Sequence, residues 1–231
     1  MATSGTTSFD LNIDEIIDEG YERCGLTTNS GYDLRSARRS LNLLFAEWGN
    51  RGIHLWKVAL HENALVSGQA EYSVSAGVND VLEAFVSTTA AGANTVNTQD
   101  VALTKMDRSA YSALPNKLAL GQPSQYYVDR ATTPKIYLYQ APDLNTYTTL
   151  KYYVIKRIED AGAYTDDPDV VYRFLPCMVA GLAYYLAMKK APQLVQQNKL
   201  IYEDQIKRAL DEDGQRASTY ITPQNFYPNG I

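Results

Sequence analysis

The apolar pattern of this chain changes period twice, and this double change most restricts the folds that the chain can adopt. Up to Gly52, apolar residues recur every three or four positions, which is typical of amphipathic helices. From Ile53 the apolar runs become short and β-prone, and from Pro168 to Asp213 the helical spacing returns. An amphipathic helix must bury its apolar stripe against another element. The sequence therefore predicts a discontinuous helical core with a strand-rich insertion between its halves.

The segment from Pro168 to Asp213 is predicted to contain two helices. Asp166-Asp167-Pro168 has the composition of a helix start, with an acidic N-cap followed by proline in the first turn. Pro176 should kink or restart this helix, because proline lacks the N–H that an interior position donates. Ala191-Pro192 should begin the second helix, which is expected to place one apolar set on a single side: Val195, Tyr202, Ile206, Ala209 and Leu210.

Two further helices are expected before Gly52. Asn12 or Asp10 can cap the first of them and Asp33 can cap the second. Trp48 belongs to the apolar stripe of the second helix, so we expect its side chain to be buried. These two helices and the two C-terminal helices would together form a four-helix core.

Between the helical segments, short runs separated by turn residues predict a series of strands. Ser67-Gly68-Gln69 is expected to form a hairpin turn, and Arg108 to Leu114 a single helical turn. Several short strands of this kind favour an antiparallel sandwich or barrel. The predicted strands are Leu55–Leu60, Ala64–Val66, Ala70–Val74, Val81–Thr88, Val101–Lys105, Gln125–Asp129, Lys135–Tyr139 and Thr148–Ile158.

These patterns predict an α+β fold made of four segments. They are a flexible N-terminus (1–8), a helical core (9–52 and 166–213), a β-rich insertion (53–160) and an extended C-terminal tail (214–231). Prolines and asparagines in the tail oppose regular structure, yet the tail carries apolar and aromatic side chains of the kind that anchor interfaces. The expected anchors are Tyr220, Ile221, Phe226, Tyr227 and Ile231.

Composition excludes several classes of function. The formal net charge is −5, whereas general nucleic-acid binders are normally basic. No apolar run is long enough to span a membrane. The two cysteines, Cys24 and Cys177, lie within helical stripes and are expected to be buried thiols. With two histidines, no Cys-x-x-Cys pair and no nucleophile elbow or phosphate-binding loop, the sequence indicates no cofactor, metal site or catalytic site.

Two charged rows on the N-terminal helices are candidate functional surfaces. Glu15, Glu19 and Glu22 share roughly one helix face, which is either a solvated face or, less simply, a carboxylate cluster for hydrolysis. Arg35, Arg38 and Arg39 form a basic stripe beside the apolar face of the second helix. That stripe can be a solvated face with local ion pairs, or an inter-subunit or phosphate contact. We expect these three arginines to contribute to a subunit interface.

Several stretches of the chain resemble one known family in the same order. The first are IDEIIDEGYERCGL and SARRSLNLLFAEWGNRGIHLW, followed by ALVSGQAEYSV, GQPSQYYVDR, PKIYLYQAPD and FLPCMVAGLAYYLAMKKAP. In combination they resemble head-to-tail adaptor proteins of short-tailed bacteriophages, also called tail accessory factors or packaged-DNA stabilisation proteins. No single stretch is chemically diagnostic.

The resemblance implies a structural protein of the virion neck, made in the host cytoplasm. In that family a helical core carries a β-rich insertion, and subunits form a ring, usually dodecameric, beneath the portal protein. The implied ring extends the DNA channel without gripping DNA and offers a platform for a tail nozzle or tail-tube protein. The family's C-terminal tail commonly reaches onto the portal.

Two other functions are compatible with the sequence. One is a virion-associated cell-wall hydrolase that uses Glu15, Glu19 and Glu22. The other is a β-sandwich carbohydrate-binding module on a helical stalk, whose hallmark would be exposed coplanar tyrosines in the insertion. The 18 tyrosines of the chain make the second alternative worth testing.

Overall fold

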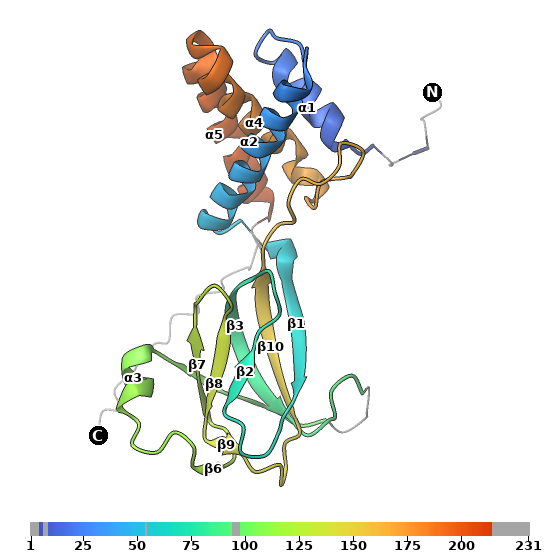
Figure 1. The fold of residues 1–231 in the computed structure, drawn as a ribbon. Coiled ribbons are helices and arrows are strands. Elements are labelled where there is room, and N and C mark those ends of the chain that lie inside the picture. Colours follow the sequence, from blue (N-terminus) through green and yellow to red (C-terminus); the bar gives the residue numbers. More distant parts are fainter. Residues whose placement is uncertain (1–4, 7–8, 54, 94–97, 214–231) are drawn as a thin grey trace, which may run out of the picture.

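The long helices gather at one end of the molecule, and the strands lie at the other end with the short helix Arg108–Ala113 (Figure 1). The computed structural model describes residues 5–6, 9–53, 55–93 and 98–213. It is a mixed α+β fold, as the sequence predicts. The predicted N-terminal arm, 1–8, lies mostly outside the described residues, and the predicted tail, 214–231, lies wholly outside them.

Four helices share one hydrophobic cluster, which we call the helical region. They are α1 (Ile13–Glu22), α2 (Gly31–Asn50), α4 (Leu175–Lys190) and α5 (Val195–Asp213). The helix α4 contacts each of the other three. Gly181 makes this close packing possible, because a Cβ there would lie only 2.8 Å from Leu44 and 3.0 Å from Tyr202.

The helix starts agree with the sequence in one case and correct it in another. Asn12 caps the start of α1 through a capping box. The Glu15 N–H donates to the Asn12 side chain, and the Asn12 N–H donates to the Glu15 carboxylate. The expectation that Asp33 caps α2 is wrong, because Ser30 holds that position. Asp33 lies three residues inside the helix, where it is buried and binds Lys190.

The predicted helix start at Asp166-Asp167-Pro168 is wrong, and α4 begins only at Leu175. Pro176 falls in its first turn, where the missing N–H costs no intrahelical hydrogen bond. Residues 168–171 are instead irregular, with a bend at 169–170, and lead into a short 3-10 helix, η2 (Tyr172–Phe174). The polar groups of Asp169 bind other segments of the chain, so this stretch is held by tertiary contacts.

The apolar stripe of α5 is narrower than predicted. Tyr202, Ile206 and Ala209 are buried, whereas Leu210 is 41% exposed. The buried residues follow one another at spacings of four and three, and Leu210 lies beside that row. The Glu203 carboxylate binds Arg51, the residue that caps the C-terminus of α2, at 2.9 Å, so it links α5 to the end of α2 rather than pairing with a residue on its own helix.

The strands form two four-stranded sheets and one short pair. The first sheet has the order β1-β10-β3-β4, with every pair antiparallel. The second has the order β2-β8-β7-β5. The bounds are β1 Val58–Ala64, β2 Glu71–Ser73, β3 Val78–Ser87, β4 Asp100–Ala102, β5 Thr104–Met106, β6 Leu120–Gly121, β7 Gln125–Asp129, β8 Lys135–Tyr139, β9 Ala141–Pro142 and β10 Thr149–Lys156.

Three strand predictions are corrected by the structure. The turn at 67–69 connects β1 and β2, which belong to different sheets, so it is not a hairpin turn. The single strand predicted at Val101–Lys105 is two strands, because the chain moves from one sheet to the other at Leu103. The fully antiparallel arrangement is also wrong, since β5 pairs with β7 in parallel, as does β6 with β9. The helical turn expected at Arg108 is α3 (Arg108–Ala113).

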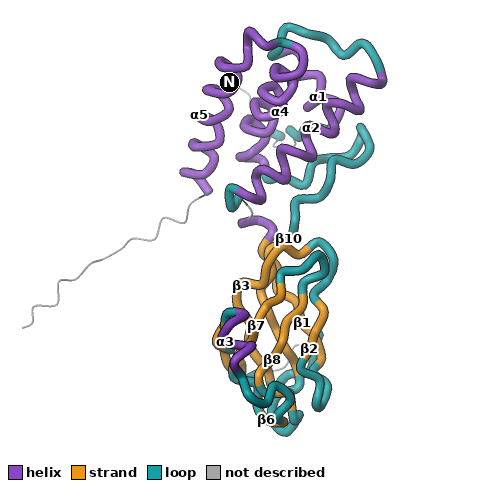
Figure 2. Tube along the Cα trace, turned by 60° about the vertical axis from the view of Figure 1, so that its left-hand side comes forward, coloured by secondary structure: helices purple, strands orange, loops and turns teal. Residues whose placement is uncertain are grey.

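A second hydrophobic cluster takes side chains from both four-stranded sheets, and we call this unit the β region. Val154 of β10 and Ile136 of β8 are among its fully buried members. The Tyr126 hydroxyl of β7 donates to the Leu82 carbonyl of β3 at 3.1 Å, which joins the two sheets directly. Figure 2 shows the strands gathered in a unit of their own, below the four long helices.

The chain crosses between the two regions twice, and Asp169 binds both crossings. The first crossing is a 3-10 turn, η1 (Leu55–Lys57), from which Lys57 forms an ion pair with the Asp169 carboxylate. On the return, the backbone N–H of Glu159 donates to the same carboxylate at 2.9 Å. The Trp56 indole donates to the Asp169 carbonyl at 3.3 Å. The two crossings are thereby held together at one residue.

We expect Trp48→Ala to lower the free energy of unfolding by about 3–5 kcal/mol. Trp48 is fully buried, packs 5.7 Å from Phe174 and donates its indole N–H to the Tyr202 hydroxyl at 3.0 Å. Urea melts followed by circular dichroism would measure the loss. Tyr32→Ala, on the exposed side of the same helix, should cost less than about 0.5 kcal/mol. A loss below about 1 kcal/mol for Trp48→Ala would contradict its burial.

We expect Asp169→Ala to lower the free energy of unfolding of the helical region by about 1.5–3 kcal/mol. The change removes the acceptor for the Glu159 N–H and leaves Lys57, whose side chain is only 12% exposed, without its counter-ion. Both tryptophans belong to or pack against the helical cluster, so tryptophan fluorescence in urea reports this region. Asp167→Ala, at an exposed position, is the matched control and should change little. Equal losses for both variants would exclude the proposed role of Asp169.

Candidate functional site

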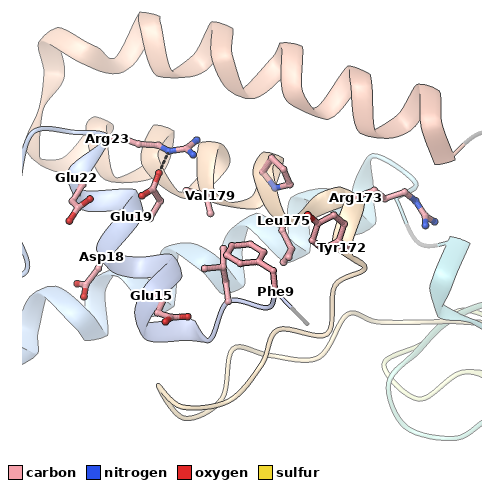
Figure 3. Close-up of a pocket in the computed structure, with 12 residues that line it drawn as sticks. Phe9, Glu15, Asp18, Glu19, Glu22, Arg23, Tyr172, Arg173, Leu175 and Val179 are labelled. Atoms are coloured by element: carbon pink, nitrogen blue, oxygen red, sulfur yellow. Dashed lines mark hydrogen bonds and ion pairs between the residues drawn. The ribbon is translucent and has the colours of Figure 1, made fainter. Parts of the chain in front are cut away.

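A groove of about 640 Å³ runs along α1 and the segment that leads into α4 (Figure 3). Its floor is apolar and includes Leu175 and Val179, which are buried, and Pro176. Two aromatic side chains stand beside it with most of their surface in solvent: Phe9 is 64% exposed and Tyr172 is 70% exposed. Large apolar side chains exposed together in this way mark interaction sites more often than solvated surface.

The other wall of the groove is acidic. It contains the three glutamates that the sequence places on one helix face, and the structure adds Asp18, which sequence analysis did not single out. Glu15 is held by the N-terminal cap of α1, and Glu19 pairs with Arg23 at 2.8 Å. Asp18 accepts a hydrogen bond from the Thr28 hydroxyl at 2.6 Å. Glu22, the last residue of α1, is exposed. Arg23 and Arg173 also line the groove, so its apolar floor is bordered by four carboxylates and two guanidinium groups, with an excess of negative charge.

The segment that returns from the β region fixes the position of α1. The first two N–H groups of α1, which have no partner within the helix, donate to carbonyls of this segment. Ile13 N–H binds the Asp166 carbonyl at 3.0 Å, and Asp14 N–H binds the Tyr164 carbonyl at 2.9 Å. The start of the acidic helix is thus hydrogen-bonded to the same segment that continues along the chain to the apolar floor at Leu175.

The predicted basic stripe on α2 is divided by the structure. Arg35 and Arg39 are exposed. Arg38 is turned toward its own chain, where it donates to the Gly162 carbonyl at 3.0 Å and lies 5.4 Å from the centre of the Tyr164 ring. Only two of the three arginines of the predicted stripe, Arg35 and Arg39, are therefore available for contacts with another molecule.

The end of α4 extends the stripe with two lysines. Lys189 donates to the Ser40 hydroxyl at 2.6 Å, and Lys190 binds Asp33. Partial burial, and then the nearby Arg39, lower the pKa of Lys189, so this ammonium lies close to a like charge. The hydrogen bond to Asp33 raises the pKa of Lys190. We define the basic face as Arg35, Arg39, Lys189 and Lys190.

Apolar side chains accompany the basic face, as they accompany the acidic groove. Tyr32 is 66% exposed and Leu43 is 53% exposed, and both lie on α2. The positions 32, 35, 39 and 43 are spaced by three or four residues, so they lie along one side of the helix. Sequence analysis identified the arginines but missed these two residues, because their exposure depends on which side of α2 faces α4.

The predicted anchors of the C-terminal tail, Tyr220, Ile221, Phe226, Tyr227 and Ile231, lie outside the described residues. Their role as a portal-binding segment therefore stays a prediction.

The described residues hold no cluster of three or more side chains suited to a metal ion. Cys24 and Cys177 are free, buried thiols, as predicted, and burial raises the pKa of Cys177 to about 12. A thiol with such a pKa is not a nucleophile at neutral pH. Within the same described residues, no helix is both long enough and apolar enough to cross a membrane.

Three tyrosines of the β region form a packed cluster. Tyr111, Tyr127 and Tyr137 are half-buried, and their rings pack on one another. Tyr111 and Tyr127 are stacked with ring centres 5.3 Å apart, and Tyr127 and Tyr137 with centres 5.9 Å apart. These three rings therefore contact one another and are each partly shielded from solvent.

A comparison with protein families gives one match over most of the chain. The model of the family described as SU10 adaptor protein matches residues 13–225. This range includes every described helix and strand, most of the groove and the basic face. A search among curated proteins gives no match.

Proposed function

The chain belongs to the SU10 adaptor protein family of phage head-to-tail adaptors, and from this premise we propose that it forms a ring beneath the phage portal. As a phage structural adaptor it contacts portal and tail components in the neck of the virion. The finer proposal is a dodecameric ring that extends the DNA channel and offers a platform for the tail nozzle or tail tube. It assigns the subunit no catalytic activity.

The match over residues 13–225 is the observation that carries this proposal. Two features of the molecule support it. The two hydrophobic clusters suggest a division into a helical domain (9–52 and 166–213) and a β-rich insertion domain (53–160). The acidic groove and the basic face are differently charged surfaces of the helical region, and a ring needs two different faces that meet head to tail.

The overall charge fits a channel through which DNA moves. A chain with a formal net charge of −5 has, on balance, an unfavourable interaction with the phosphate backbone. DNA bound tightly by the neck would be held back during ejection, whereas a repelling wall leaves it free to slide. We therefore propose that DNA passes through the ring without specific binding.

We expect Arg35→Glu with Arg39→Glu to reduce ring formation on the portal by tenfold or more. Reversing two exposed charges on the proposed interface replaces attraction by repulsion. The melting temperature should change little, because neither side chain is buried. Electron microscopy of portal–adaptor mixtures would count the complete rings.

Arg38→Glu serves as the contrasting variant. Because Arg38 binds Gly162 and Tyr164 of its own chain, this change should lower the melting temperature. Unimpaired rings from the variant with Arg35 and Arg39 reversed would remove both residues from the subunit interface. A portal that recruits no wild-type chain would refute the proposed function itself.

Deletion of residues 215–231 should reduce portal binding by an order of magnitude or more and leave the thermal stability almost unchanged. The deletion removes five apolar or aromatic side chains that we propose as portal anchors. Surface plasmon resonance on immobilised portal would measure the loss.

Single substitutions in the same segment separate anchors from bystanders. Phe226→Ala and Tyr227→Ala should each give a share of the loss, and Asn229→Ala should give little. A sharp fall of the melting temperature on deletion would instead show that the segment completes the fold of its own subunit.

A further inference from the structure

The acidic groove and the basic face lie on separate surfaces of the same helical region. The groove is lined by residues from 9–23 and 172–179 (Figure 3). The basic face is built from α2 and the last residues of α4. The two surfaces share no residue, so one chain can offer both at once.

The two surfaces match in chemistry. The groove joins an acidic rim, with Asp18 and Glu22, to the exposed rings of Phe9 and Tyr172. The basic face joins Arg35 and Arg39 to the exposed side chains of Tyr32 and Leu43. A contact between them would pair opposite charges around buried aromatic surface, which is the usual anatomy of a specific interface.

We propose that the groove receives the basic face of a neighbouring copy of this chain. The proposal rests on the ring proposed above and names the contact that closes it. The same head-to-tail contact, repeated around a ring, uses one groove and one basic face of every subunit.

The charge of the chain favours a second copy in one orientation. Because each copy carries a net charge of −5, two copies repel one another over most approaches. The approach that brings the basic face onto the acidic rim is the exception. The chain's own C-terminal tail suits the rim less well, since Arg216 is the only lysine or arginine in 214–231.

A charge-swap experiment tests the contact. One variant carries Asp18→Lys and Glu22→Lys, and a second carries Arg35→Glu and Arg39→Glu. All four positions are on helices, and Glu22 lies in the last turn of α1, where lysine suits the helix dipole. A third variant carries all four substitutions and keeps the wild-type net charge of −5.

Each double variant alone should form at least tenfold fewer rings on the portal, because its interface sets like charges against each other. The fourfold variant should recover ring formation, and so should an equimolar mixture of the two double variants. Asp211→Lys with Glu212→Lys, at exposed positions of α5, changes the net charge as much as the groove variant does and should leave assembly unchanged. Circular dichroism melts would show that every variant is folded.

Three results would overturn the proposal. The first is a groove variant that assembles like the wild type. The second is a fourfold variant that assembles no better than the double variants. The third is a groove variant whose single subunits lose affinity for the portal while self-association is kept, which would assign the groove to the portal.

Sedimentation velocity of the full chain at low ionic strength separates this proposal from the proposed function. If the portal recruits no wild-type chain, the proposed ring beneath the portal is refuted. The same four variants are then compared by their self-association in solution. Charge-dependent self-association that follows the swap would support the groove contact without the portal. A wild-type chain that also shows no self-association would overturn it.

Discussion

The carboxylate of Asp169 determines how the two regions of this molecule are joined. Lys57 directly precedes β1, and Glu159 follows β10, and both bind this one side chain. The two strands are themselves antiparallel neighbours, with Val58 opposite Ile155. The β region is therefore connected to the helical region through two paired strands whose ends are both held by the Asp169 carboxylate. Two such connections limit the rotation of one region relative to the other more than a single linker would.

The helical periodicity was sufficient to predict α1, α2 and most of α5, because their apolar residues recur along one side. It failed at 166–174, where Asp-Asp-Pro has the composition of a helix start but Asp169 is bound by two distant segments. It failed at Leu103 for a related reason, since a run of β-prone residues carries no mark of the point at which the chain changes sheet. Local propensity describes neighbours in sequence, and both errors lie where distant contacts decide the conformation.

The charged surfaces were only half predictable. Spacing placed the glutamates on one face of α1 and the arginines on one face of α2. The aromatic residues that give the glutamate row an apolar partner come from elsewhere: Phe9 precedes α1, and Tyr172 lies in η2. No sequence pattern connects Tyr172 with Glu22, because they come to line one groove only when α4 packs on α1. The net charge of −5 likewise gives no sign that the molecule has one acidic and one basic surface. Composition therefore predicts solubility better than it predicts binding partners.

The split helical region also sets an order of events during synthesis. Residues 58–156 form the two sheets and are contiguous, so the β region can fold while the ribosome is still making the rest of the chain. The helices α1 and α2 can bury their apolar faces only later, because the helix that covers these faces begins at Leu175. The floor of the groove is translated at the same late stage. A chain that terminates before Leu175 thus lacks the floor of the groove, and with it the surface that we propose for the contact between subunits.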